Sequence, residues 1–330
     1  MNDKQNSNQD QEINFTGNPS LHQVVKRSKR KQTMKTILIA LISTIILLTF
    51  IFVGSGFILN KQINKLESSY DTVHGANIMR IGTTYDYNLF SVTAETHYQK
   101  KIGNRYIVWD MKTEKIPIIG KPEIINTGSG MMEMDRFDEE AQRYVRYNNF
   151  NNQRKIDFYY PKLDYTNLPH ELEVAVELEE NKLIEVALSF KEPITITDLG
   201  EQLGYVNVDW LWVDTTTEAQ MKRMNTELDN DSVKTKGGEG AFGFAVSPDY
   251  PYSKGGKFDY IGLLERLSKN DRYKSSIKKA INNIKENTRT SNREIRLNGA
   301  VVTGTPKELK RFQELDFVRA SVIGATIDKY

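Results

Sequence analysis

The chain has 330 residues, a formal net charge of +2 and no cysteine. The lack of cysteine excludes disulfide bonds, thiolate metal sites and cysteine nucleophiles. The charge is unevenly divided, because residues 1–35 carry a net charge of +4 and the remaining residues a net charge of −2. The four histidines are scattered, and none is paired at the i, i+4 spacing of helical metal ligands. The sequence therefore predicts no metal and no other cofactor.

The chain begins with a polar stretch and continues into a basic one. Residues 1–17 are rich in Asn and Gln and contain too little apolar surface to favour folding. Asn18 and Pro19 then form a helix-start signal. An apolar stripe follows at helical spacing: Leu21, Val24 and Val25. Six basic residues come next: Lys26, Arg27, Lys29, Arg30, Lys31 and Lys35.

An uncharged apolar segment of 24 residues runs from Thr36 to Leu59. As an α-helix it would be about 36 Å long, enough to cross a hydrocarbon core of roughly 30 Å. We predict a single transmembrane helix with a cytoplasmic N-terminus, because basic residues are concentrated before the segment. The alternative, a cleaved signal peptide, usually has a shorter apolar core and an A-x-A-like site, which is missing here. Small residues in the segment would allow contact with a second membrane protein or a homodimer.

The tail before this segment has two possible roles. Its apolar stripe either lies on the inner surface of the membrane or binds a cytoplasmic partner as a short amphipathic helix. Its basic residues, adjacent to the membrane, indicate contact with membrane lipid rather than with nucleic acid. We therefore expect partner binding at Leu21, Val24 and Val25, and no nucleic-acid partner.

Beyond the membrane, the pattern predicts a short stalk helix and then strands. From Ala76 the chain is dense in β-branched and aromatic residues, and Gly103-Asn104 is placed as a hairpin turn. The segment 131–154 has a possible helix that decays into a polar Asn-rich stretch. We place the boundary between two outer regions near Asn148 to Arg154.

The second outer region has more regular patterns. Alternating apolar residues predict a hairpin from Leu172 to Phe190 and a strand from Val206 to Trp212. Helices are predicted at 198–203, 260–268 and 272–287. At the end, Thr305-Pro306-Lys307-Glu308 is a capping box between two strands, which predicts a β-α-β unit with parallel strands. We expect this unit and the hairpin to share one sheet.

The predicted architecture is an α+β protein with one N-terminal transmembrane helix, followed by an extracytoplasmic region with mixed β-sheet and helices on one face. Its segments are a cytoplasmic basic tail (1–35), the transmembrane helix (36–59), a juxtamembrane helix with a β-rich region (60–150) and an α+β region (155–330).

No enzyme signature emerges from the candidate motifs. Gly237-Gly238-Glu239-Gly240 neither follows a strand nor carries the Lys-Ser/Thr of a phosphate-binding loop, which favours a mobile loop. The acidic group Asp135, Asp138, Glu139 and Glu140 does not match a calcium loop, which favours a solvated helix face. Trp210 and Trp212 would share a sheet face, where core packing is commoner than a sugar-binding groove.

Several blocks of the chain resemble the sigma factor regulator family of Gram-positive bacteria. They are VVKRSKRKQTMKTILIALISTIILLTFIFVGSGFILNK, NIMRIG and IGNRYIVWD near the start, and IEVALSFKEPIT, VDWLWVDT and LNGAVVTGTPKELKRFQELDFVRASVIGAT near the end. The resemblance implies a membrane-bound anti-sigma factor that holds an extracytoplasmic-function sigma factor away from RNA polymerase. The expected function is thus regulation of a sigma factor in response to an envelope signal. The alternative is a membrane-anchored extracytoplasmic binding module without sigma-factor contact.

Overall fold

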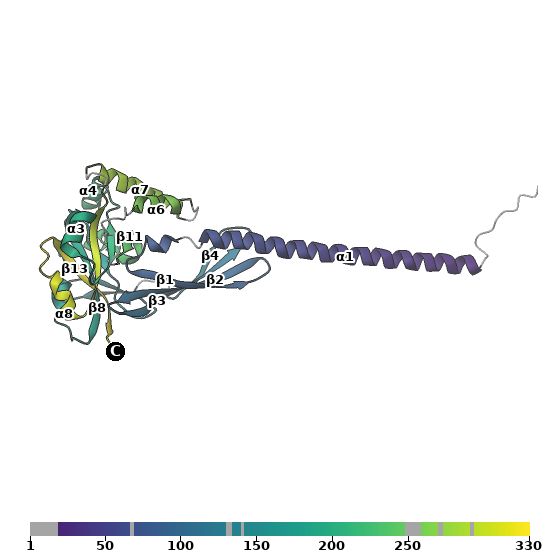
Figure 1. The fold of residues 1–330 in the computed structure, drawn as a ribbon, viewed down its shortest axis with the longest axis horizontal. Helices are drawn as coiled ribbons and strands as arrows, with labels where there is room; N and C mark the ends of the chain where they lie inside the picture. Colours follow the sequence, from purple (N-terminus) through teal and green to yellow (C-terminus); the bar gives the residue numbers. More distant parts are fainter. Residues whose placement is uncertain are drawn as a thin grey trace, which may run out of the picture. The chain divides into compact units, whose positions relative to one another are not determined.

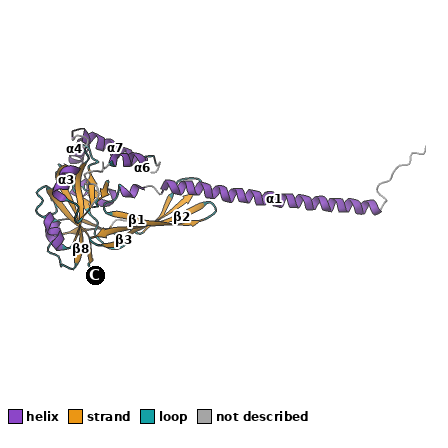
Figure 2. Ribbon diagram, in the orientation of Figure 1, coloured by secondary structure: helices purple, strands orange, loops and turns teal. Residues whose placement is uncertain are grey.

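The computed structural model describes residues 19–66, 69–129, 134–139, 142–247, 259–269, 273–290 and 294–330 (Figure 1). It forms two compact units, Met1–Ile58 and Leu59–Tyr330. Its elements are mixed helix and sheet (Figure 2), as expected for an α+β protein.

Helix α1 (Pro19–Leu66) contains the whole of the predicted span and begins at the proline of the predicted start signal. Among the described residues it is the one helix long and apolar enough to cross a membrane. Two threonine hydroxyls in the span are satisfied within the helix, because Thr44 Oγ1 donates to the Ala40 carbonyl and Thr49 Oγ1 to the Ile45 carbonyl, both at 2.8 Å. Such pairing removes the cost of a bare hydroxyl in hydrocarbon. The helix indicates a single-pass membrane anchor.

A four-stranded antiparallel sheet follows in the second unit. Its strands are β1 (Ile78–Tyr87), β2 (Ser91–Ile102), β3 (Arg105–Pro117) and β4 (Glu123–Thr127), in that order. The hairpin predicted at Gly103-Asn104 is confirmed, since Ile102 pairs with Arg105. Gly103 has a φ of +59°, and a Cβ there would lie 2.9 Å from Leu183 Cδ2. Both the turn and this close approach require glycine.

The possible helix in 131–154 is wrong. The described part of this segment forms a hairpin of β5 (Met134–Asp138) and β6 (Arg143–Tyr147), paired from Met134–Tyr147 to Asp138–Arg143. Val145 is fully buried between more exposed neighbours, as in a strand that covers a core with one face. After β6, Asn148 Nδ2 donates to the Trp109 carbonyl at 2.6 Å. This contact attaches the hairpin to β3.

A five-stranded sheet forms the centre of the second unit, in the order β11-β9-β12-β8-β13. The strands are β8 (Lys182–Thr195), β9 (Val208–Val213), β11 (Gly243–Ala245), β12 (Arg296–Gly304) and β13 (Val318–Asp328). All four pairings are antiparallel. Because β8 lies between them, β12 and β13 run in the same direction, as predicted, but they are not neighbours. Helix α8 (Pro306–Leu309) joins them and has the predicted capping box of Thr305 and Glu308.

The first arm of the predicted Leu172 to Phe190 hairpin is wrong, because it contains helix α2 (Glu171–Ala175). Leu172 and Ala175 are buried, whereas Val174 is 55 % exposed, which is a helical pattern. The helix is fixed by distant partners: the Leu172 amide donates to Ser321 Oγ at 2.9 Å on β13. The second arm, β8, does share a sheet with β12 and β13.

Both faces of this sheet are covered, not one. Helices α3 (Ile196–Leu203), α6 (Tyr260–Leu267) and α7 (Lys274–Asn287) pack with one face in an aliphatic core. The other face packs against β7 (Asp157–Phe158) and Met221 of α4 (Glu218–Glu227). The predicted core role of Trp210 and Trp212 is confirmed, and Phe158 stacks on Trp212 at 4.8 Å between ring centroids.

The segment Gly237-Gly238-Glu239-Gly240 is not a mobile loop. Gly237 pairs with Asp157 as part of β10 (Lys236–Gly237), and Gly238 is buried at the start of the 3-10 helix η2 (Gly238–Gly240). A Cβ at Gly238 would lie 2.6 Å from Ile156 Cγ1, so glycine is needed for packing.

Three further short helices belong to the second unit. Helix α5 (Asp231–Lys234) lies just before β10, and the 3-10 helices η3 (Thr288–Thr290) and η4 (Lys310–Phe312) follow α7 and α8.

A buried ion pair joins the two sheets. Lys100 Nζ on β2 donates to both carboxylate oxygens of Glu185 on β8, each at 2.9 Å, and both side chains are at most 2 % exposed. Asn77 Nδ2 donates to the same carboxylate at 3.0 Å, and the Ala325 amide donates at 3.3 Å. The Lys100 ammonium also lies 3.9 Å from the centroid of the Trp109 ring. The pair is therefore almost fully hydrogen-bonded, which offsets its desolvation.

The segment between α1 and β1 is packed into the second unit. It contains the 3-10 helix η1 (Ser69–Thr72), and Val73 and Ala76 are fully buried. Tyr70 stacks on Tyr273 with 3.9 Å between ring centroids, and the Tyr260 hydroxyl donates to the Val73 carbonyl at 3.1 Å. These contacts attach the juxtamembrane segment to helices α6 and α7.

We expect Lys100→Met to destabilise the second unit by about 3–5 kcal/mol, because the Glu185 charge stays buried without a counter-charge. Adding Glu185→Gln should restore much of the loss. Urea unfolding of the full chain in detergent, followed by tryptophan fluorescence, measures this. Lys182→Met is the matched control, since Lys182 pairs with Asp328 at the surface. Its loss should lower the free energy of unfolding far less than the loss of Lys100. Equal losses in the two Lys→Met variants would contradict a structural role for the buried pair.

His74 gives the second unit a pH dependence. Burial, aided by Lys236, lowers the pKa of His74 from 6.5 to about 4. The unfolded chain therefore binds a proton between these values and the folded chain does not, so this stabilisation is complete above pH 6.5 and is lost as the pH falls toward 4. This stabilisation amounts to roughly 3 kcal/mol. His74→Phe keeps an aromatic ring between Tyr70 and Phe242. It should remove this contribution to the pH dependence of the unfolding free energy between pH 7 and 4.5. If the unfolding free energies of wild type and variant changed with pH in parallel, this account would be refuted.

Candidate functional site

The part of α1 before the span carries the predicted partner-binding and basic residues. Val24 is 62 % and Val25 is 49 % exposed, and the side chain of Leu21 lies outside the described residues. All six basic residues are exposed: Lys26, Arg27, Lys29, Arg30, Lys31 and Lys35. Because the basic residues occur on all sides of the following turns, the apolar stripe is limited to one turn of the helix. The structure thus presents the two valines and the basic residues on one continuous helix.

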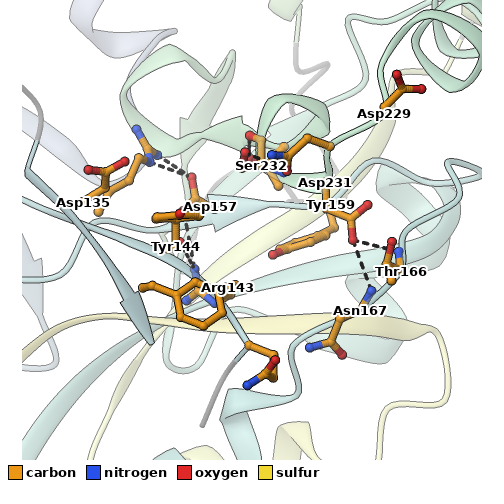
Figure 3. A pocket seen from close by; sticks show the side chains of 15 residues that line it. Asp135, Arg143, Tyr144, Asp157, Tyr159, Thr166, Asn167, Asp229, Asp231 and Ser232 are labelled. Atoms are coloured by element: carbon orange, nitrogen blue, oxygen red, sulfur yellow. Dashed lines mark hydrogen bonds and ion pairs between the residues drawn. The ribbon is translucent and has the colours of Figure 1, made fainter. Parts of the chain in front are cut away.

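A cleft of about 950 Å³ lies in the second unit, between the β5–β6 hairpin and the loops around α5 (Figure 3). Its walls combine aromatic, acidic, basic and neutral polar side chains: Asp135, Phe137, Gln142, Arg143, Tyr144, Arg146, Asp157, Tyr159, Thr166, Asn167, Asp229, Asn230, Asp231, Ser232 and Thr235. Phe137 and Tyr144 pack edge to face, with 5.3 Å between ring centroids. The cleft is large enough for a small polar ligand.

The base of the cleft is an ordered network of charges. Asp157 accepts from Arg146 and lies 3.8 Å from Arg143 Nη1. Burial raises the pKa of Asp157, and the two arginines only partly oppose it. Glu171 accepts from Arg143 Nη2 and from Arg154 Nη2, both at 2.8 Å. Burial alone would lower the pKa of Arg143, but Glu171 raises it above the usual value.

The rim of the cleft is organised by helix α5. Asp231 Oδ2 accepts from the Thr166 amide at 2.7 Å and from the Asn167 amide at 3.2 Å, which Figure 3 shows as dashed lines. Asn230 caps α5, since its side chain accepts from the Ser232 amide at 2.9 Å. Asp135 lies across the cleft on β5 and is exposed. Acidic groups on both sides, with aromatic rings between them, favour ligands that carry hydroxyl or amino groups.

Of the acidic residues predicted to lie on a solvated helix face, those that the structure describes are not on a helix. Asp135 and Asp138 lie on β5 rather than on a helix face, and Glu140 lies outside the described residues. In the part of the chain that is described, no three His, Asp or Glu side chains lie together as metal ligands would.

Sequence reasoning missed the cleft. Its residues come from four separate segments of the chain, 135–146, 157–159, 166–167 and 229–235. One local signal lay in the hairpin, where Arg143-Tyr144-Val145-Arg146-Tyr147 alternates in a strand-like manner. Helix α5 also had an Asn cap signal at Asn230.

The chain matches two family models. The model described as sigma factor regulator N-terminal matches residues 22–107, and the model described as sigma factor regulator C-terminal matches residues 176–325. No curated protein and no solved structure matches the chain. The first match covers the basic segment, the span, β1, β2 and the turn into β3, and the second covers most of the five-stranded sheet. Together they account for well over half of the sequence in the expected order. The chain therefore belongs to the sigma factor regulator family.

Proposed function

We propose that this protein is a membrane-bound anti-sigma factor that controls an extracytoplasmic-function sigma factor in response to an envelope signal. Membership of the family supports a regulatory, non-enzymatic role toward a sigma factor. The observation that carries the proposal is the extent of the N-terminal match, which begins at residue 22 and continues through the span into the first sheet. Residues 22–35 of the tail, the span and the first two strands of the four-stranded sheet thus lie within one family match.

The proposed orientation places residues 1–35 in the cytoplasm and the second unit outside. Its support is the basic flank, with Lys26, Arg27, Lys29, Arg30, Lys31 and Lys35 before the span, against Lys61 and Lys65 with nearby Glu67 and Asp71 after it. Basic residues are retained on the cytoplasmic side during insertion. The domain organisation predicted from the sequence is part of this proposal.

The proposed contact with the sigma factor is the stripe of Leu21, Val24 and Val25. Basic residues alone give salt-sensitive attraction to anionic surfaces, whereas specific recognition needs apolar anchors that become buried. Val24 and Val25 are exposed on a helix and free of packing within their own unit. A helix in a groove of the sigma factor is the binding mode that such a stripe fits.

The outer unit is the proposed receiver of the envelope signal, and the cleft beside α5 is its candidate site. The cleft combines volume, a buried charge network and exposed polar groups. The base of the cleft is connected to the central sheet through Arg143, which donates to Glu171. Glu171 Oε2 in turn accepts from the Ile323 amide of β13 at 2.8 Å. Binding that disturbs Glu171 would therefore disturb the sheet joined to the span.

Val24→Asp should weaken retention of the sigma factor about 30-fold, since a buried apolar anchor contributes roughly 2 kcal/mol. Crosslinking and pull-down of the full chain from membranes measures retention, and a reporter of the sigma regulon should rise in parallel. Val206→Asp is the matched control, because Val206 is 55 % exposed in the second unit. Unchanged retention in Val24→Asp at wild-type protein level would support the anchored binding module instead.

The orientation is testable because the chain has no cysteine of its own. In whole cells, a membrane-impermeant maleimide should label Tyr205→Cys, whose native side chain is 48 % exposed in the second unit. It should label Val25→Cys only after the membrane is permeabilised. Labelling of Val25→Cys in intact cells would reverse the proposed topology.

A further inference from the structure

Two hairpin loops of the four-stranded sheet expose apolar side chains at the same place. The β1–β2 connection contains Leu89 and Phe90, which are 46 % and 60 % exposed, and the β3–β4 connection contains Ile119, which is 90 % exposed. The two loops are joined, because the Ile118 amide donates to the Phe90 carbonyl at 2.9 Å. We call Leu89, Phe90 and Ile119 the hairpin tips. Exposed apolar side chains grouped in this way indicate an interaction surface.

The hairpin tips lie beside the residues of α1 that directly follow the apolar segment. Gln62 Nε2 donates to the Ile118 carbonyl at 2.9 Å, and the Tyr87 hydroxyl donates to Asn60 Oδ1 at 3.2 Å. Leu59, the last residue of the predicted span, is only 2 % exposed. It belongs to the core of this sheet, together with Ile63 and the strand residues Val92, Ala94 and Ile116.

These contacts determine the distance of the hairpin tips from the hydrocarbon. With a rise of 1.5 Å per residue, Gln62 is about 4.5 Å beyond Leu59 along the helix. The polar interface on each side of a bilayer is roughly 5–8 Å thick. A loop bonded to Gln62 is thus held within the interfacial layer as long as α1 spans the membrane.

The charged and aromatic neighbours of the hairpin tips suit a lipid surface. Lys61, Lys115 and Lys121 are exposed next to the two loops, and Tyr87 is 55 % exposed at the end of β1. Lysines attract anionic headgroups by about 1 kcal/mol each, and tyrosine is enriched at membrane interfaces. Asp86 and Glu123 are also exposed there, so the local charge is only slightly positive. Apolar insertion therefore supplies more of the attraction than charge does.

We propose that the hairpin tips insert into the interfacial layer of the leaflet at the C-terminal end of the span. The four-stranded sheet then has two attachments to the bilayer, the end of α1 and the tips themselves. This contact involves lipid, is independent of the sigma factor, and holds for either orientation of the chain in the membrane. Its failure would leave the proposed function unaffected.

Spin labels on single cysteines test this proposal in the full chain. Phe90→Cys and Ile119→Cys, labelled with a nitroxide and reconstituted in vesicles of phosphatidylcholine and phosphatidylglycerol, should collide more with apolar oxygen than with a water-soluble nickel chelate. Tyr205→Cys is the matched control, because Tyr205 is an exposed aromatic residue on the loop before β9. Its label should collide more with the nickel chelate. All three positions are exposed, so the substitutions leave the core intact.

Two results would overturn the proposal. In one, the labels at positions 90 and 119 are as accessible to the nickel chelate as the label at position 205. In the other, the spectra of the tip labels are broadened by neighbouring spins, and dilution with unlabelled chain removes the broadening. The second result would assign the surface to contact between copies of this chain rather than to lipid.

Discussion

The buried pair of Lys100 and Glu185 is the constraint on which the second unit depends. A charge with 2 % or less of its side chain exposed is tolerated only if its partner and its hydrogen-bond donors are in place. Lys100 belongs to the N-terminal family region and Glu185 to the C-terminal one, and Asn77 donates to the same carboxylate. The part of the N-terminal region that lies within the second unit and the C-terminal region are therefore folded together, and neither can satisfy its buried charge alone.

The elements that could be predicted are those specified by adjacent residues. Gly103-Asn104 determines the β2–β3 turn, and Thr305-Pro306 with Glu308 determines the start of α8, because each signal acts within four residues. The span is specified by 24 uncharged residues in succession. The direction of β12 and β13 follows from the short helix between them, but the insertion of β8 between these strands depends on residues more than 100 positions earlier.

The elements that could not be predicted are determined by distant partners. Leu172 to Leu178 alternates like a strand, yet Glu171 binds Arg143, Arg154 and the Ile323 amide, and these contacts favour α2. The β5–β6 hairpin and the cleft depend on the same network, because Arg143 and Arg146 are needed beneath Asp157 and Glu171. Secondary-structure propensity is a weak guide to a segment whose backbone conformation is determined by several buried charges.

The same contacts restrict how a signal can reach the membrane. Leu59 and Ile63 of α1 are in the core of the four-stranded sheet, and Tyr70 and Val73 are in the core of the five-stranded sheet. The end of α1 is thus packed against one sheet and the following segment against the other, while Lys100 and Glu185 join the two sheets. Closely packed cores transmit displacement rather than absorb it. On the proposed function, a ligand that shifts Glu171 acts on the end of α1 through the two sheets.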